Sequence, residues 1–322
     1  MPITEFQVDE RRNAETLIEL AMAEDLGTAM PGFHLDRASG RIAFDLSEAS
    51  SNGRDVTTES TLPQNARGSA RFVARTTGVV SGLPVLGMIA DRFGVRWCYP
   101  KVEDGQRVEP GTLIAVIMGP MYRLLLMERT ALNFLQHLSG IATLTSRHVS
   151  ATAGTKATIL DTRKTTPGWR SLEKYAVRCG GGTNHRMGLF DAVLIKDNHI
   201  AWLAFDEGCE PVSAAIRSAR AKAPAGMIVE VEVDSLEQFD IALENQPDII
   251  LVDNLGSELL AEAVRRRNAR APGVLLEASG GVSLETVTAL AATGVDRISV
   301  GALTHSAPAL DIGLDFNLSG PS

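Results

Sequence analysis

The stretch between residues 158 and 200 gathers the side chains of this protein that are best suited to chemistry. Arg163 and Lys164 follow one short apolar run, and Lys196 follows another. Short apolar runs are typical of buried parallel strands, and polar residues at the ends of such strands form the active sites of α/β proteins. Between the two runs, three consecutive glycines lead into His185-Arg186. Because surface charge would not follow strand ends, the pattern predicts a pocket for a small molecule with several negative charges.

Acidic groups and glycines follow the later apolar runs. Glu230 and Glu232 alternate with valines, so they share one face of a predicted strand. Two carboxylates on a buried face are costly unless a cation or hydroxyl groups satisfy them, and with Asp253 they indicate magnesium or sugar hydroxyls. Ser279-Gly280-Gly281 and Val300-Gly301-Ala302 end the last two runs and resemble phosphate-binding turns.

The elements that must position these groups repeat in a β/α rhythm. Intervals of about 20 to 37 residues suit a strand followed by a crossover helix. The apolar runs end at Leu160, Ile195, Val233, Val252, Leu276 and Val300. Six units favour a parallel α/β barrel that is incomplete, since a full barrel has eight strands. A doubly wound open sheet is the structural alternative.

The first part of the chain has a different texture. Residues 13–26 repeat apolar positions at helical spacing and end at Gly27, and residues 28–52 form an irregular insertion whose RIAFDL segment could be an edge strand. Short alternating runs at 68–118 predict strands, with turn residues that favour a hairpin within 104–116. A helix is expected at about 128–153, with Gly140 as a possible break.

Composition limits the classes of function. A net charge of −8 and a pI of about 5.4 argue against nucleic acid as a general partner. Since no apolar run approaches the roughly 18 residues of a membrane helix and the N-terminus lacks a secretory pattern, we expect no membrane partner. Cys98, Cys179 and Cys209 form neither a CxxC pair nor a zinc pattern, which favours a reduced, cytoplasmic location.

Several motifs together resemble the quinolinate phosphoribosyltransferases, also called decarboxylating nicotinate-nucleotide pyrophosphorylases. The resemblance covers nearly the whole chain, and DTRKTTPG followed by NHRMGL and LIKDNH is highly specific. The other matching motifs are EDLG, DVTT, GVVSGLPV, ERTALNFLQHLSGIAT, EVEVDSLEQ, ILVDN, LEASGGV and DRISVGALTHSAPALDIGLDF. The chain departs from the family by an insertion of about 25 residues between EDLG and DVTT.

The resemblance implies an architecture and an assembly. It implies an N-terminal α/β sandwich domain at 1–128, which carries the insertion, and an incomplete α/β barrel of about six strands at 129–304. It also implies a tail at 305–322 that returns to the first domain. Family members are homodimers, in which an arginine matching Arg129 reaches the active site of the neighbouring subunit. The resemblance does not specify whether dimers associate into larger assemblies.

The resemblance also implies roles for residues. Arg163, His185, Arg186 and Lys196 match the ligands of the quinolinate carboxylates, although His185 could instead be a structural histidine. Lys164, Glu232 and Asp253 match the catalytic groups around phosphoribosyl pyrophosphate, with Glu232 and Asp253 holding Mg²⁺ together with the donor's pyrophosphate. Glu230 is expected to face solvent or to lie behind these ligands. The remaining substrate-binding positions are Thr162, Ser279, Gly280, Gly281, Val300, Gly301 and Ala302, of which Ser279, Gly280 and Gly301 match the 5′-phosphate site.

The implied reaction joins quinolinate to phosphoribosyl pyrophosphate and releases pyrophosphate and carbon dioxide, giving nicotinate mononucleotide for NAD biosynthesis. One alternative is an enzyme of the same fold with another aromatic acid as acceptor, such as the family members associated with molybdenum transport. Another is a β/α-barrel aldolase that uses Lys164 or Lys196 as a Schiff base. A non-catalytic anion-binding or carrier module is the third.

Overall fold

The computed structural model describes residues 5–27, 32–36, 41–45, 54–95, 97–204 and 210–317. The chain forms two compact units. The first comprises Met1–Thr143, Pro167–Cys179 and Pro308–Ser322, and the second comprises Leu144–Thr166 and Gly180–Ala307. The segment 167–179 belongs to the first unit, although the chain on either side of it belongs to the second.

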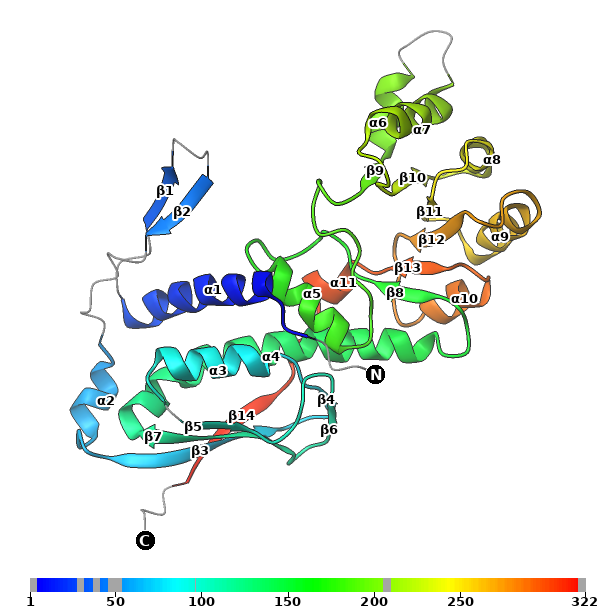
Figure 1. Ribbon diagram of the computed structural model, residues 1–322. Helices are drawn as coiled ribbons and strands as arrows, with labels where there is room; N and C mark the ends of the chain where they lie inside the picture. Colours follow the sequence, from blue (N-terminus) through cyan, green and yellow to red (C-terminus); the bar gives the residue numbers. More distant parts are fainter. Residues whose placement is uncertain are drawn as a thin grey trace. The chain divides into compact units, whose positions relative to one another are not determined.

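The second unit is built on a six-stranded parallel sheet (Figure 1). Its strands are β8 (Thr158–Leu160), β9 (Val193–Ile195), β10 (Val229–Val233), β11 (Ile249–Asp253), β12 (Leu275–Ser279) and β13 (Arg297–Ser299). The strand order is β8-β13-β12-β11-β10-β9, so the chain moves around the sheet in one direction. A doubly wound sheet would reverse its direction at a switch point. The incomplete barrel is therefore confirmed, with β8 and β9 at its two open edges.

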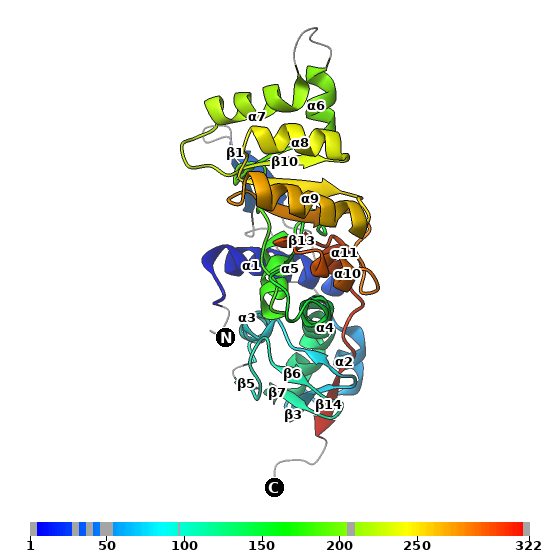
Figure 2. The same ribbon diagram turned by 90° about the vertical axis from the view of Figure 1, so that its right-hand side faces the viewer.

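Helices cover one face of this sheet. They are α6 (Asp197–Leu203), α7 (Pro211–Lys222), α8 (Leu236–Glu244), α9 (Ser257–Arg270), α10 (Val287–Ala292) and α11 (Ala302–His305). Figure 2 shows α7, α8 and α9 following one another along the sheet. In α8, Ser235 caps the first turn and buried Phe239, Ala242 and Leu243 recur at helical spacing. Packing of these apolar helix faces against the sheet stabilises the strands. The loops that follow the carboxyl ends of the strands can then carry the functional residues.

The first unit contains an antiparallel sheet of order β14-β3-β7-β5. These strands are β3 (Arg67–Ala74), β5 (Trp97–Pro100), β7 (Leu113–Pro120) and β14 (Ile312–Asn317). The C-terminal strand β14 lies beside β3, as Figure 1 shows. The helices of this unit include α1 (Val8–Leu26), α2 (Val56–Thr61), α3 (Leu83–Arg92), α5 (Arg170–Cys179) and most of α4 (Met121–Ala151).

Of two local predictions for the first part of the chain, the hairpin is wrong and the strand in the insertion is confirmed. The predicted hairpin within 104–116 is wrong, because β6 (Arg107–Val108) pairs with β4 (Gly78–Val79), while β7 pairs with β3 and β5. In the insertion, β2 (Arg41–Asp45) is the expected strand and pairs with β1 (Gly32–Asp36) in a two-stranded ribbon. The rest of 28–52 lies outside the described residues.

The helix α4 (Met121–Ala151) begins earlier than the sequence indicates and is not broken at Gly140. A β-carbon on Gly140 would lie 2.2 Å from the carbonyl oxygen of Pro308. The glycine therefore permits a close approach of the C-terminal segment to the helix and does not mark an end.

Candidate active site

A pocket of about 400 Å³ lies at the carboxyl ends of the barrel strands. Nine of the expected residues line it, and Leu194, Leu251, Glu277 and Ser299 join them. The nine are Thr162, Arg163, Lys164, His185, Arg186, Lys196, Glu232, Asp253 and Ser279. A larger cavity of about 670 Å³ lies beside α2 in the first unit, but its one lining arginine, Arg54, is paired with Glu59. The smaller pocket is therefore the candidate site.

The loop after β8 presents Arg163 and Lys164. The Thr162 hydroxyl accepts a hydrogen bond from the Lys164 N–H at 3.0 Å, and the Thr304 hydroxyl donates to the Lys164 carbonyl at 2.8 Å. These two bonds fix the backbone, so the side chains of both basic residues start from a defined place. The Nε atom of Arg163 is buried and has no hydrogen-bond partner among the described residues.

A buried carboxylate fixes the segment that carries the other two predicted anion ligands. Asp161 is fully buried and accepts hydrogen bonds from the His185 N–H at 2.8 Å and from Asn184 Nδ2 at 2.6 Å. Thr183 also bridges to Leu160 of β8. The segment after the three glycines is thus anchored beside β8, at the open edge of the barrel. The guanidinium of Arg186 donates to the Ala192 carbonyl at 2.9 Å.

The arginines make the pocket electropositive. Burial, together with the nearby positive charge of Arg163, lowers the pKa of Arg186 below its ordinary value. An arginine stays charged despite such a shift, so the two guanidinium groups repel each other. A ligand with adjacent negative charges relieves that repulsion.

Glu232 and Asp253 also line the pocket, and we call these carboxylates its acidic wall and the basic residues its basic wall. Lys196 precedes α6, and its ammonium forms an ion pair with Glu232 of β10. Asp253 ends β11, and one of its oxygens accepts a hydrogen bond from Asn254 Nδ2 at 2.6 Å. Asn254 has a φ of 55°, in the left-handed region, which asparagine tolerates better than most residues. The side chain of Asp253 is therefore held at the mouth of the pocket by its own neighbour.

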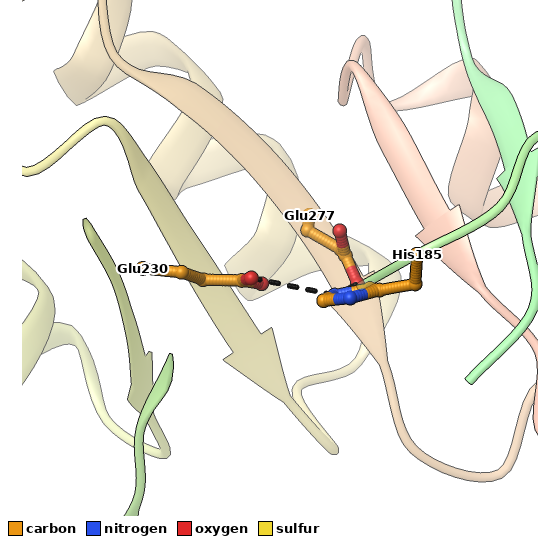
Figure 3. Close-up of side chains that lie close together, drawn as sticks. All are labelled: His185, Glu230 and Glu277. Carbon is orange, nitrogen blue, oxygen red and sulfur yellow. Dashed lines mark ion pairs between the residues drawn. The ribbon is translucent and has the colours of Figure 1, made fainter. Parts of the chain in front are cut away.

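Beneath this wall, three side chains meet in the barrel interior (Figure 3). His185 Nε2 lies 3.3 Å from Glu230 Oε2 and 3.4 Å from Glu277 Oε1, and Arg297 Nε donates to Glu277 Oε2 at 2.6 Å. Glu230 is 1% exposed, so the expectation that it faces solvent is wrong, whereas the expectation that it lies behind the ligands agrees with its position. Burial lowers the pKa of His185 and the two glutamates raise it, and their carboxylates favour a ring proton on Nε2, the atom that faces them.

Two sets of side chains are chemically suited to a cation. His185, Glu230 and Glu277 offer ligand atoms that lie within 4.8 Å of one another, and a nitrogen with two carboxylates suits a transition metal. Glu232 and Asp253 offer oxygen alone, which Mg²⁺ prefers when it also binds a substrate phosphate. The residues present therefore fit the expected Mg²⁺.

Other predicted residues do not line this pocket. Gly280, Gly281, Val300, Gly301 and Ala302 follow Ser279 and Ser299, which do. Gly280 has a φ of 90°, and a β-carbon there would lie 2.2 Å from Asn254 Oδ1, so the turn requires glycine. Arg129 lies on α4 in the first unit, and its expected role stays a prediction.

Sequence reasoning missed the part played by Glu277. A signal exists, because this carboxylate stands in the apolar run VLLEAS, where an unpaired charge would be costly. Its partners, His185 and Arg297, come from distant parts of the sequence, so they could not be assigned from the run itself.

Comparison with known proteins decides the family. The model of the quinolinate phosphoribosyl transferase N-terminal domain matches residues 55–139, and that of the C-terminal domain matches residues 141–315. The chain belongs to this family. The nicotinate-nucleotide pyrophosphorylase [carboxylating] of Mycobacterium leprae is 49% identical over 285 residues, which cover 87% of this chain and 98% of that protein. The mitochondrial quinolinate phosphoribosyltransferase [decarboxylating] 2b of Nicotiana tabacum is 40% identical, over 84% of this chain and 80% of its own.

Solved structures agree with this membership. The nicotinate-nucleotide pyrophosphorylase of Francisella tularensis superposes with a TM-score of 0.80 at 32% identity, covering 98% of this chain and 99% of that one. NadC from Streptococcus pyogenes gives a TM-score of 0.81 at 34% identity, with the same coverage. Within the residues described here, no helix has the length and apolar character needed to cross a membrane.

Proposed function

We propose that this pocket transfers a phosphoribosyl group from phosphoribosyl pyrophosphate to quinolinate, with loss of carbon dioxide, to give nicotinate mononucleotide and pyrophosphate. The chain would thus be a pentosyltransferase of NAD biosynthesis. The observation that carries the proposal is that the guanidinium groups of Arg163 and Arg186 line one cavity together with the carboxylates of Glu232 and Asp253.

The basic wall suits the acceptor. Quinolinate carries two adjacent carboxylates, and planar guanidinium groups bind carboxylates through two parallel hydrogen bonds. Arg163, Arg186 and Lys196 supply the positive charge, and Leu194 and Leu251 supply apolar surface for an aromatic ring. A flat dianion therefore satisfies both the charge and the shape of this side of the cavity.

The acidic wall suits the donor. Glu232 and Asp253 would hold Mg²⁺ together with the donor's pyrophosphate, and Lys164 would approach the same phosphates from the end of β8. When bound, Mg²⁺ supplies positive charge that stabilises the departing pyrophosphate. Ser279 with Gly280 and Gly281, and Gly301 with its neighbours Val300 and Ala302, would receive the 5′-phosphate through backbone N–H groups.

The protein's part in the reaction is positioning and charge stabilisation. The ring nitrogen forms a bond with C1 of the ribose while the bond from C1 to pyrophosphate breaks. The ring nitrogen then carries positive charge, which stabilises the electron pair left on C2 when its carboxylate departs as carbon dioxide, and a proton takes that place. No covalent protein intermediate is required.

A competition assay tests the proposal. Purified protein is given phosphoribosyl pyrophosphate and Mg²⁺ with equal quinolinate, nicotinate and nicotinamide, and the nucleotide products are separated. We expect product from quinolinate with equal amounts of pyrophosphate and carbon dioxide. Turnover of nicotinamide without turnover of quinolinate would refute the assignment, and preferential use of another aromatic acid would show that the acceptor is different.

The same preparation distinguishes a transferase from an aldolase and from a binding module. An aldolase that uses Lys164 or Lys196 would be trapped by borohydride in the presence of a carbonyl substrate. The ammonium of Lys196 is already paired with Glu232, which disfavours its attack on a carbonyl group. An anion-binding module would bind quinolinate without releasing pyrophosphate.

We further propose a cytoplasmic homodimer with shared active sites, in which Arg129 enters the pocket of the neighbouring chain. Leu189 and Phe190 support an interface near the pocket, since these apolar side chains are 74% and 76% exposed in a single chain. Mixing an Arg129→Ala subunit with an Arg163→Ala subunit tests this arrangement. Random exchange should restore about a quarter of wild-type activity, because half of the dimers then hold one intact pocket. Exchange without recovery would contradict it.

A further inference from the structure

The ring of His185 is held from two directions inside the barrel. Its Nε2 atom lies between carboxylate oxygens of Glu230 and Glu277, at 3.3 and 3.4 Å. Its Nδ1 atom accepts the N–H of Arg186 at 2.7 Å. Because Nδ1 is an acceptor, the ring proton lies on Nε2, where it faces the two carboxylates. Both ring nitrogens are thus occupied by the protein, and the ring offers C–H edges to the cavity.

The two glutamates come from strands that are not neighbours. Glu230 lies on β10 and Glu277 on β12, with β11 between them (Figure 3). His185 comes from the segment beside β8, at the edge where the barrel is open. The contact therefore ties the segment beside the edge strand β8 to the interior of the sheet.

The contact of His185 with the two glutamates positions the next residue in the chain, Arg186. Arg186 lines the cavity, and its backbone N–H is bonded to the His185 ring. A rotation of that ring would release the N–H and shift the guanidinium relative to Arg163. A displacement of about 1 Å in a binding group can change a rate by up to about 100-fold.

We propose that Glu230, Glu277 and His185 are positioning residues for the acceptor clamp, and that His185 acts by holding Arg186 and does not itself bind the acceptor's carboxylate. This inference rests on the proposed function and deepens it. It replaces a direct role for His185 with an indirect one, and it assigns a role to two buried glutamates.

The arrangement is not optimised for stability. Glu230 Oε1 and Glu277 Oε1 are buried and lack a hydrogen-bond partner within the described residues. Burial and the neighbouring Glu277 carboxylate raise the pKa of Glu230, so the charge of Glu230 is kept at a cost, whereas Glu277 is also paired with Arg297. Neutralising Glu230 should therefore lower activity without lowering stability.

The experiment uses the full-length chain with Glu277→Gln, Glu230→Gln and His185→Ala, alone and combined. Glu258→Gln on the exposed face of α9 is the matched control. For both glutamate variants we expect the KM for quinolinate to rise about 10- to 100-fold, with an unchanged KM for phosphoribosyl pyrophosphate. The Tm should be unchanged or higher for Glu230→Gln, and lower for Glu277→Gln because Arg297 loses its buried partner. Adding Glu277→Gln to His185→Ala should change the quinolinate KM no further, because the glutamate acts through the histidine.

Several outcomes would overturn the inference. Additive effects of Glu277→Gln and His185→Ala would mean that the glutamate acts by another route. A crystal structure with quinolinate in which a His185 ring nitrogen lies within hydrogen-bond distance of a substrate carboxylate would restore the direct role. Elemental analysis that finds one transition metal per chain, lost in Glu277→Gln, would make the cluster a metal site. Wild-type turnover in the same assay tests the proposed function separately, and direct binding of quinolinate to each variant supplies a readout that does not depend on turnover.

Discussion

The two ends of the barrel sheet use the same charged residue types in opposite ways. At the amino end, Asp296 precedes β13 and accepts hydrogen bonds from Lys156 Nζ at 2.6 Å, Arg267 Nη1 at 2.7 Å and the Leu276 N–H at 2.8 Å. Arg267 is 2% exposed and also donates to the Val274 carbonyl at 2.6 Å. Each charge here has an opposite charge or a hydrogen bond within the protein.

At the carboxyl end, the balance is left incomplete. The positive charge of Arg163 disfavours the charge of Arg186, and Arg163 Nε lacks a hydrogen-bond partner among the described residues, as do Glu230 Oε1 and Glu277 Oε1 deeper in the barrel. Unsatisfied polar groups cost stability unless a ligand completes them. The paired charges at the amino end (the closed end) therefore stabilise the strands. The unpaired groups at the carboxyl end (the open end) are available to bind substrate.

The largest expected effect is on stability and comes from the closed end. Arg267→Ala removes the buried guanidinium that pairs with Asp296 and donates to the Val274 carbonyl, and breaking a buried ion pair costs about 3 kcal/mol or more. Urea unfolding should show this loss, while kcat/KM per folded chain stays near wild type. Arg265→Ala is the matched control on the same helix, since that side chain is 76% exposed. Equal stability of the two variants would contradict the comparison.

The next effect is on activity and comes from the open end. Arg163→Lys keeps the charge but loses the planar fork, so quinolinate use should fall by about 2 kcal/mol, or roughly 30-fold in kcat/KM. The Tm should not fall, because Arg163 has an unpartnered Nε atom to begin with. Arg217→Lys, on the exposed side of α7, serves as control. An unchanged dependence on quinolinate concentration would place Arg163 outside the clamp.

The sequence predicts the ligand-binding residues of the open end better than the ion-pair partners of the closed end, for a physical reason. Residues that bind ligands follow strand ends directly, so Arg163, Lys196 and Asp253 can be placed from the apolar runs that precede them. Partners inside a closed network are set by the fold and not by local pattern. Nothing in the run around Arg267 identifies Asp296 as its partner.

The two buried glutamates could be predicted from the sequence only in part. Glu230 and Glu277 each stand in an apolar run, which marks them as unusual. The residue that joins them, His185, belongs to a segment at the open edge of the barrel, and only the three-dimensional order of β10, β11 and β12 brings the three together.

A smaller effect separates the two acidic residues of the pocket. Asp253→Asn should weaken donor and Mg²⁺ binding by about tenfold and leave quinolinate binding unchanged. Glu232→Gln should weaken the donor similarly but also free Lys196, so quinolinate binding should change as well. Calorimetric titration of each variant with the donor, Mg²⁺ and quinolinate measures these affinities. Identical patterns for the two variants would show that the ion pair does not couple the walls of the pocket.

The smallest effect concerns the exposed partner at the closed end. Lys156 is 53% exposed, so Lys156→Ala should cost less than about 1 kcal/mol in the free energy of unfolding at neutral pH. Burial alone raises the pKa of Asp296, but hydrogen bonds from Lys156, from the Leu276 N–H and from Arg267 outweigh it and lower the pKa overall.

The sign of the pH dependence follows from that lowered pKa. A carboxylate whose pKa is lower in the folded state adds stability above its unfolded pKa of about 3.9, and this stability is lost as the pH falls through the folded pKa. The difference between wild type and Lys156→Ala should therefore be largest at neutral pH and shrink towards zero in acid. Urea unfolding from pH 7 downward measures the trend. A difference that grows on acidification would mean that Asp296 is not the carboxylate that Lys156 stabilises, and that this end of the barrel is less closed than its distances indicate.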